Sequence, residues 1–212
     1  KNPYRALPQG LRQGREGMCP PRTTLRRAED ASDEVACVKY LGLFRHAKSD
    51  WDDRAQRDFD RGVNERGRRG AAIMGRHIRR HDIAWDCLLA SPAVRVRLTL
   101  EEAALDIKPV FDPRFYLAGV ETHLELVREL AGDANAVLIA AHNPGLQDVV
   151  LALVSKEHET PDFREAMVKF PTASFAVLEL PIDDWSELGA QNAKLVHFKR
   201  PRDLDPNLGP ED

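Results

Sequence analysis

Two arginines and two histidines stand just beyond three apolar segments of this 212-residue chain. Arg45 and His46 follow the first segment, Arg95 comes shortly after the second, and His142 directly follows the third. Arginine guanidinium groups present planar forks of donors that suit the oxygens of a phosphoryl group. A neutral imidazole can attack phosphorus while fixed positive charges stabilise the transferring oxygens. These residue types therefore indicate phosphoryl chemistry that requires no metal ion.

The elements that must position these side chains are predicted from the spacing of the apolar residues. Short apolar runs predict strands at 38–44, 86–90, 136–141, 173–180 and 193–198, with an extended segment at 108–116. Apolar residues three and four apart predict helices at 64–80, from 91 to 103, at 121–131 and from 144 to 153. Asn64 is expected to cap the first helix, and Pro92 to lie in the first turn of the second.

Strands that alternate with helices from residue 38 onward predict an α/β domain with a mostly parallel sheet. Ligands of such sheets lie beyond the carboxyl ends of the strands. Because Arg45, His46, Ser91, Arg95 and His142 all follow predicted strands, we expect them to meet at one edge of the sheet. Arg95 also falls in the first turn of its predicted helix, where the helix dipole and the backbone amides favour an anion.

The composition limits the classes of partner. Hydrophobic residues make up 42% of the chain and charged residues 31%, which excludes disorder of the whole chain. The formal net charge of -3 gives no general attraction to nucleic acid, and no apolar run reaches the roughly 18 residues of a membrane span. Cys19, Cys37 and Cys87 are odd in number and widely spaced, which predicts neither a disulfide framework nor a metal knuckle. We therefore expect a protein of the cytoplasm.

Three regions are predicted along the chain. Residues 1–36 form a basic extension that we expect to be disordered, because it is rich in Arg, Pro and Gly. An organellar transit peptide is a second interpretation of this Arg-rich, acid-poor stretch, and a third is that residues 1–17 do not belong to the native protein. Residues 37–204 are expected to form one domain, and residues 205–212 a frayed tail.

Several blocks of sequence resemble a known family. The stretch LFRHAKSDW resembles the Arg-His-Gly signature of the histidine phosphatase (phosphoglycerate mutase-like) superfamily. The stretches ASPAVRVRLTLE and LIAAHNPGL are further matches to this superfamily, and RDFDRGVNERGRRGA, FPTASFAVLEL and VHFKRPRDL are similar to its SixA-type phosphohistidine phosphatase branch. The resemblance is specific because the blocks lie in the expected order over about residues 37 to 204 and in consistent strand contexts. It implies a three-layer α/β/α sandwich.

The resemblance also implies roles for the four central residues. His46 matches the nucleophile that accepts the phosphoryl group, Arg45 and Arg95 match the two arginines that clamp phosphate, and His142 matches the second histidine of the pocket. A two-step reaction follows, in which His46 takes the phosphoryl group and water then releases phosphate from it.

The chain departs from the family pattern at positions beside these residues. Ala47 replaces the glycine of the signature, Ala141 replaces a serine before the second histidine, and Gly62-Val63 replaces a Pro-Leu pair. None of these departures changes the four central side chains, so we expect activity to be retained.

The general acid is the open part of the site. Cleavage of an alkyl phosphate benefits from a protonated carboxyl, which contributes about 10²–10⁴-fold. Glu121 is the candidate, with the loop residues Asp50, Asp52 and Asp53 as alternatives. Glu121 equally suits the start of a helix, and the aspartates suit loop turns.

Polar residues next to the signature have two interpretations each. Lys48 and Ser49 either contact the phosphate or cap the loop. Arg61 is expected to be a solvated surface residue, with the rim of the pocket as the alternative. His77 and His81 have zinc-like spacing on one helix but no third ligand, so no metal is expected. The polar segment 155–172 could serve as a lid that determines specificity.

If no acid is present, leaving groups that depart readily are favoured. The imidazole of phosphohistidine is one, and acyl or aryl phosphates behave similarly. We therefore predict a metal-independent phosphatase that forms a phosphohistidine intermediate on His46 and acts on a phosphohistidine protein or another small activated phosphoryl compound. A non-catalytic phosphate-binding or phosphoprotein-binding signalling module is the alternative, and a phosphomutase is a further one. We expect no cofactor, no nucleic acid and no membrane among the partners.

Overall fold

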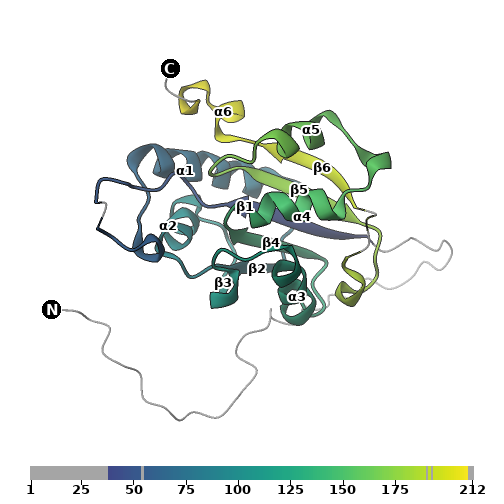
Figure 1. Ribbon diagram of the computed structural model, residues 1–212. Helices are drawn as coiled ribbons and strands as arrows, with labels where there is room; N and C mark the ends of the chain where they lie inside the picture. The colour runs from purple at the N-terminus through teal and green to yellow at the C-terminus, as the bar shows by residue number, and fades with distance from the viewer. Residues whose placement is uncertain (1–37, 54, 190, 192, 210–212) are drawn as a thin grey trace, which may run out of the picture.

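A six-stranded mixed sheet with the strand order β3-β2-β4-β1-β5-β6 runs through the molecule (Figure 1). The computed structural model describes residues 38–53, 55–189, 191 and 193–209. The strands are β1 (Lys39–Arg45), β2 (Cys87–Ala90), β3 (Pro109–Phe111), β4 (Ala136–Ala141), β5 (Phe175–Leu180) and β6 (Lys194–Lys199). The helices are α1 (Glu65–Arg80), α2 (Val94–Ala103), α3 (Val120–Leu130), α4 (Gly145–Leu153), α5 (Pro161–Val168) and α6 (Pro201–Leu204).

Four neighbouring strands of this sheet are parallel. β1 pairs with β4, β4 with β2, and β2 with β3, all in the parallel sense. β5 runs antiparallel to β1, and β6 runs antiparallel to β5. The α/β class with a mostly parallel sheet is thus confirmed, and the antiparallel β5 is what makes the sheet mixed.

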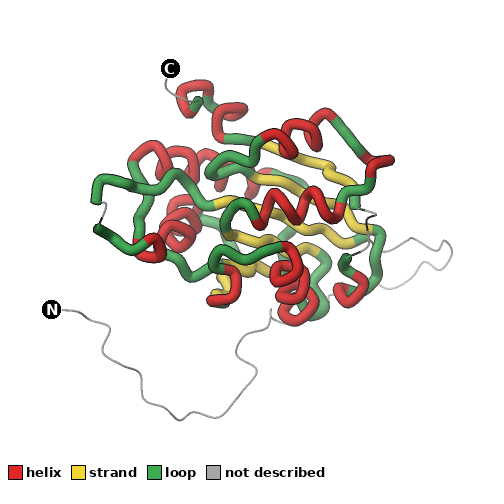
Figure 2. The backbone as a smooth tube through the Cα atoms, in the orientation of Figure 1, coloured by secondary structure: helices red, strands yellow, loops and turns green. Residues whose placement is uncertain are grey.

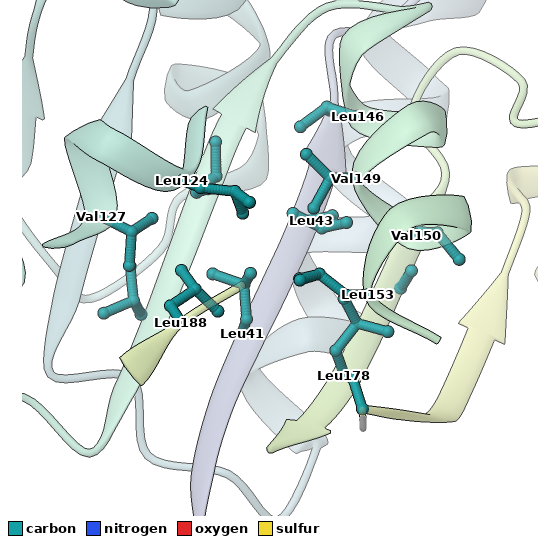
Figure 3. Close-up of a cluster of buried hydrophobic side chains, with 14 of the residues drawn as sticks. Leu41, Leu43, Leu124, Val127, Leu146, Val149, Val150, Leu153, Leu178 and Leu188 are labelled. Carbon is teal, nitrogen blue, oxygen red and sulfur yellow. The ribbon is translucent and has the colours of Figure 1, made fainter. Parts of the chain in front are cut away.

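Helices cover both faces of the sheet (Figure 2). On one face, apolar residues of α3, α4 and α5 pack against inward side chains of β1 and β4. Figure 3 shows this core, in which Leu41 and Leu43 of β1 lie near Leu124 of α3 and Leu153 of α4. On the other face, Met74 of α1 and residues of α2 pack against the opposite side of the same strands. The result is the three-layer α/β/α sandwich that the resemblance implied.

The helix that follows β1 begins where its sequence predicts. The side chain of Asn64 accepts a hydrogen bond from the backbone N–H of Gly67, which satisfies one of the free amides of the first turn. The second helix begins later than predicted, because Ser91 and Pro92 form a turn out of β2 and α2 starts only at Val94. Arg95 still lies in the first turn of α2, as expected.

Two expectations, one about the C-terminal tail and one about the cysteines, are corrected. The tail does not fray at residue 205, because residues 206–208 form a 3₁₀ turn, Leu208 is buried, and its carbonyl accepts a hydrogen bond from Arg66 at 2.8 Å. Cys87 takes part in a disulfide bond, whereas the cysteine spacing predicted no disulfide framework. The extension at 1–36 lies outside the described residues. Within the part that is described, none of the helices has the length and apolar character needed to cross a bilayer.

Candidate active site

The parallel pairing of β1 with β4 brings the two predicted histidines together. Arg45, the last residue of β1, lies opposite Ala141, the last residue of β4. His46 and His142 are therefore the first residues beyond two adjacent strands, and their ring centroids lie 5.2 Å apart. Both side chains are buried at this edge of the sheet.

One ring nitrogen of His46 has a free electron pair. Its Nδ1 lies 2.8 Å from the carbonyl oxygen of Ala47. Because a carbonyl can only accept, Nδ1 carries the proton and Nε2 is left unprotonated. Burial lowers the pKa of His46 to about 3, and the charges of Arg45 and Arg95 act in the same direction against the raising effect of the Ala47 carbonyl. The ring is therefore neutral and nucleophilic at physiological pH.

The backbone around His46 is held from three sides. The N–H of His46 donates to Ala141 of β4 at 3.1 Å, and its carbonyl accepts from the N–H of Ala173 at 3.0 Å. The next N–H, of Ala47, donates to the hydroxyl of Thr99 at 2.8 Å. That hydroxyl in turn donates to the carbonyl of Arg95 at 2.6 Å, so Thr99 joins the nucleophile segment to α2. Sequence reasoning did not identify Thr99, although its place one helical turn after Arg95 is a usable signal.

His142 is buried and also neutral. Its Nε2 lies 2.8 Å from the hydroxyl of Ser91, which follows β2. Burial is the main cause that lowers the pKa of His142 to about 3, and the nearby His46 and Arg95 act in the same direction. Among the described residues, its Nδ1 has no hydrogen-bond partner. The edge of the Tyr116 ring faces it at a centroid distance of 5.5 Å.

Arg95 makes two hydrogen bonds to one acidic residue. Its side chain is only 5% exposed, and its two terminal nitrogens donate to the backbone carbonyl of Asp58 at 2.5 Å and to the carboxylate of Asp58 at 2.9 Å. The hydroxyl of Tyr116 donates to the same carboxylate oxygen at 2.7 Å. Burial alone would raise the pKa of Asp58, but Tyr116 and Arg95 outweigh it and hold that pKa below its usual value. Asp58 and Tyr116 were missed, although Asp58 lies inside the block RDFDRG.

Arg45 is held by the segment that precedes β5. Its guanidinium donates to the carbonyl of Phe170 at 2.6 Å, and its Nε is buried with no partner among the described residues. Burial lowers the pKa of Arg45 to about 10, and the positive charge of Arg95 acts in the same direction. The side chain of Asn143 also donates to the Phe170 carbonyl, at 3.1 Å. The segment 155–172 thus contacts the site through one backbone carbonyl.

The remaining predicted residues are placed less centrally. Ser49 is buried in a bridge with Val63, and its side chain makes no hydrogen bond to the other described residues. Lys48 is exposed beside Arg45 and lines a cavity with it. Glu121 is exposed in the first turn of α3, and within the described chain its carboxylate makes no hydrogen bond or ion pair. The structure therefore does not bring Glu121 into contact with the four central side chains.

Arg61 differs from its expected place, and His77 and His81 have a third histidine beside them. Arg61, expected on the solvated surface, is only 7% exposed, and its guanidinium stacks against the ring of Trp51 at 4.1 Å. His77 and His81 are joined by His197 of β6, whose Nε2 lies 2.8 Å from that of His77. In the described ranges, no three or more His, Cys, Asp or Glu side chains are arranged to hold a metal ion.

Comparisons with known proteins agree with this geometry. The family model of the histidine phosphatase superfamily (branch 1) matches residues 41–116, which include His46 and Arg95. An uncharacterized protein of Mycobacterium leprae is 31% identical over 163 residues, covering 74% of this chain and 99% of that protein. A chloroplastic protein of Arabidopsis thaliana is 27% identical over 180 residues, covering 77% of each chain.

Solved structures give the same result. The SixA protein of Nakamurella multipartitia superposes with a TM-score of 0.69 at 28% identity, covering 77% of this chain and 96% of that one. The SixA protein of Agrobacterium tumefaciens superposes with a TM-score of 0.63 at 29% identity, covering 77% and 99%. These matches support phosphatase activity. The chain belongs to the histidine phosphatase superfamily, and its structure is of the SixA type.

Proposed function

We propose that this chain is a metal-independent phosphatase that forms a phosphohistidine intermediate on His46. The observation that carries the proposal is the hydrogen bond from Nδ1 of His46 to the Ala47 carbonyl. This bond leaves the Nε2 electron pair free in a neutral ring. The guanidinium groups of Arg45, the residue before His46, and of Arg95, whose charges both act on the His46 ring, supply fixed positive charge for a phosphoryl group.

In the first step, Nε2 of His46 attacks phosphorus in line with the leaving group. A P–N bond to His46 forms, and the bond to the leaving group breaks with its electron pair going to that group. Arg45 and Arg95 hold the phosphoryl oxygens, and Arg95 exchanges its contact with Asp58 for them. Nδ1 of His142 has no partner among the described residues, so its N–H can donate a hydrogen bond to a phosphoryl oxygen when Ser91 donates to its Nε2.

In the second step, water attacks the phosphorus of phospho-His46. The P–N bond breaks, its electron pair returns to Nε2, and the proton of the attacking water passes to the departing phosphate. Orthophosphate leaves, and the Ala47 carbonyl keeps Nδ1 protonated throughout. The neutral resting state of His46 is thereby restored for the next substrate.

The carboxylates around the site favour an activated substrate. Asp58 hydrogen-bonds to Arg95, and its lowered pKa keeps it ionised, so it is a poor proton donor to an alkoxide. Glu121 makes no contact with the four central side chains. The imidazole of phosphohistidine departs readily once solvent has protonated its other ring nitrogen, and acyl or aryl leaving groups depart without strong acid assistance. Phosphohistidine is the substrate class that this argument favours, and the similarity to SixA proteins supports it.

Transfer of a radiolabelled phosphoryl group tests the proposal. The purified chain is mixed with labelled phosphohistidine or an aryl phosphate and quenched rapidly, and the bound label is tested for the acid lability of phosphohistidine. We expect label on the unmodified chain and on His158→Ala, which removes an imidazole outside the site, and none on His46→Ala. Label retained by His46→Ala would remove His46 as acceptor. Phosphate binding with no label and no turnover in any form would identify a binding module instead.

A further inference from the structure

A basic cavity lies beside the proposed phosphoryl site. Its volume is about 320 Å³, and it shares Arg45 with that site. It is bounded by the end of β1, the start of α1 and the segment around α6. Six of its lining residues are basic: Arg45, Lys48, Arg66, Lys169, Arg200 and Arg202. None of the lining residues described by the structure is Asp or Glu.

Most of this positive charge is not neutralised within the fold. Arg200 is paired, because it contacts Asp203 at 2.9 Å and Glu165 at 2.7 Å. The other five basic lining residues form no ion pair with any acidic residue in the described part of the chain. Like charges gathered around one cavity repel each other, and an anion bound among them relieves that repulsion.

Two of the arginines are held in place without a counter-ion. Arg66 donates to the carbonyl of Leu208 at 2.8 Å and also to that of Gly209, so the C-terminal turn fixes its guanidinium at the cavity. Arg45 is fixed by the Phe170 carbonyl and keeps its Nε unpartnered among the described residues. Donors that are already ordered lose little conformational freedom when an anion binds.

One wall of the cavity is formed where α1 packs closely against the segment after His46. A Cβ on Gly67 would lie 2.4 Å from the carbonyl oxygen of Lys48, so glycine lets α1 touch the segment after His46. The opposite wall is also tied to His46, because Ala173 lines the cavity and donates its N–H to the His46 carbonyl. Arg45, Lys48 and Ala173 therefore connect the lining of the cavity to the segment that carries His46.

We propose that this cavity binds a second anionic group, a phosphate or a carboxylate, of the same small molecule whose phosphoryl group reaches His46. The proposal rests on the proposed function, since it assumes that Arg45 and His46 receive that phosphoryl group. It narrows the substrate to small phosphoryl compounds that carry another anion. A volume at the lower end of the roughly 300–1,000 Å³ range of ligand pockets suits such a compound.

Binding of substrate-like phosphonates tests this without requiring turnover. Calorimetry compares methylphosphonate, which has one anionic group, with phosphonoacetate, its longer homologues and methylenediphosphonate, which have two. We expect the unmodified chain to bind at least one doubly anionic probe about tenfold more tightly or better. The double variant Lys169→Gln/Arg202→Gln should lose this preference to within about twofold and keep its affinity for methylphosphonate.

Lys108→Gln is the matched control, since Lys108 is exposed and lies outside the cavity. Lys169 and Arg202 are also exposed, so their replacement is not expected to unfold the chain, which circular dichroism checks. No preference for any doubly anionic probe in the unmodified chain, or a preference that survives in the double variant, would overturn the subsite. Either of these results together with normal labelling of His46 removes only the subsite. If the unmodified chain prefers doubly anionic probes but His46 is not labelled, the proposed function is wrong and the cavity is an anion-binding site only.

Discussion

Asp58 gives Arg95 two acceptors at once, its carboxylate at 2.9 Å and its own backbone carbonyl at 2.5 Å. Asp58 begins a 3₁₀ turn at Asp58–Asp60, in the long connection between β1 and α1. Because Tyr116 donates to the same carboxylate, the negative charge is fixed next to Arg95 and the two histidines. A phosphoryl group must therefore compete with an internal carboxylate for Arg95. Asp58 orients Arg95 and also weakens its hold on phosphate.

Replacement of Asp58 by asparagine separates these two effects. Asparagine keeps an oxygen that can accept from Arg95 and removes the negative charge that repels phosphate. We expect Asp58→Asn to bind orthophosphate and vanadate about tenfold more tightly, which corresponds to about 1.4 kcal/mol. Inhibition constants measure this, with Asp60→Asn as the control, because Asp60 pairs with the exposed Arg57. Weaker binding by Asp58→Asn would mean that the carboxylate serves only to orient Arg95.

The neutrality of His46 in the free protein predicts its titration. Burial places the pKa of His46 at about 3, whereas an imidazole in an unfolded chain has a pKa of about 6.5. The folded chain should therefore keep His46 neutral from pH 7 down to about pH 4. Nitrogen-15 NMR of histidine-labelled protein, assigned with His46→Ala, follows this directly, and denatured protein provides the reference titration. A His46 signal that titrates near pH 6.5 in the folded chain would contradict the neutral nucleophile.

The three imidazoles of His77, His81 and His197 predict a loss of stability in acid. Burial lowers the pKa of His197 to about 4, with further lowering by His81 and then His77. The unfolded chain, with a pKa of about 6.5 at this residue, binds more protons between pH 4 and pH 6.5. Stability is therefore complete above pH 6.5 and falls as the pH drops through this window. Urea unfolding at pH 7 and pH 5 should show a smaller pH difference for His197→Asn than for the unmodified chain.

Val196→Ala is the control for that measurement. Val196 is an exposed neighbour on the same strand, so its replacement tests whether any change in β6 alters the pH dependence. The control should keep the full difference between pH 7 and pH 5. An equal difference in His197→Asn and the unmodified chain would show that the imidazole cluster does not contribute.

The meeting of His46 and His142 could be predicted because it depends on strand order alone. Both residues follow apolar runs, and parallel strands in register place the residues after them side by side. The cap at Asn64 was predictable for a similarly local reason, since its side chain bonds to an amide three residues away. In both cases a local pattern places the side chain: the end of an apolar strand for each histidine, and the start of a helix for Asn64.

The contacts of Asp58 could not be predicted in this way. Its hydrogen bond with Arg95 joins residues 37 positions apart and depends on the path of the irregular connection between β1 and α1. That connection has no periodic pattern of apolar residues from which its path could be predicted. The contact of the buried Arg61 with Trp51 lies in the same connection. Glu121 was the candidate acid but equally suited the start of a helix, and α3 does begin there and leaves Glu121 exposed.

Thr99 should act as a positioning residue for the nucleophile. Thr99→Val keeps the shape of the side chain but leaves the buried N–H of Ala47 without its acceptor, which should cost about 1–3 kcal/mol of stability. Because Ala47 is next to His46, we also expect kcat to fall on the order of tenfold. Thr99→Ser keeps the hydroxyl and should restore kcat, while Thr122→Val on α3 should leave kcat unchanged. A stable Thr99→Val with full activity, or a serine variant as slow as valine, would refute a hydroxyl-dependent role.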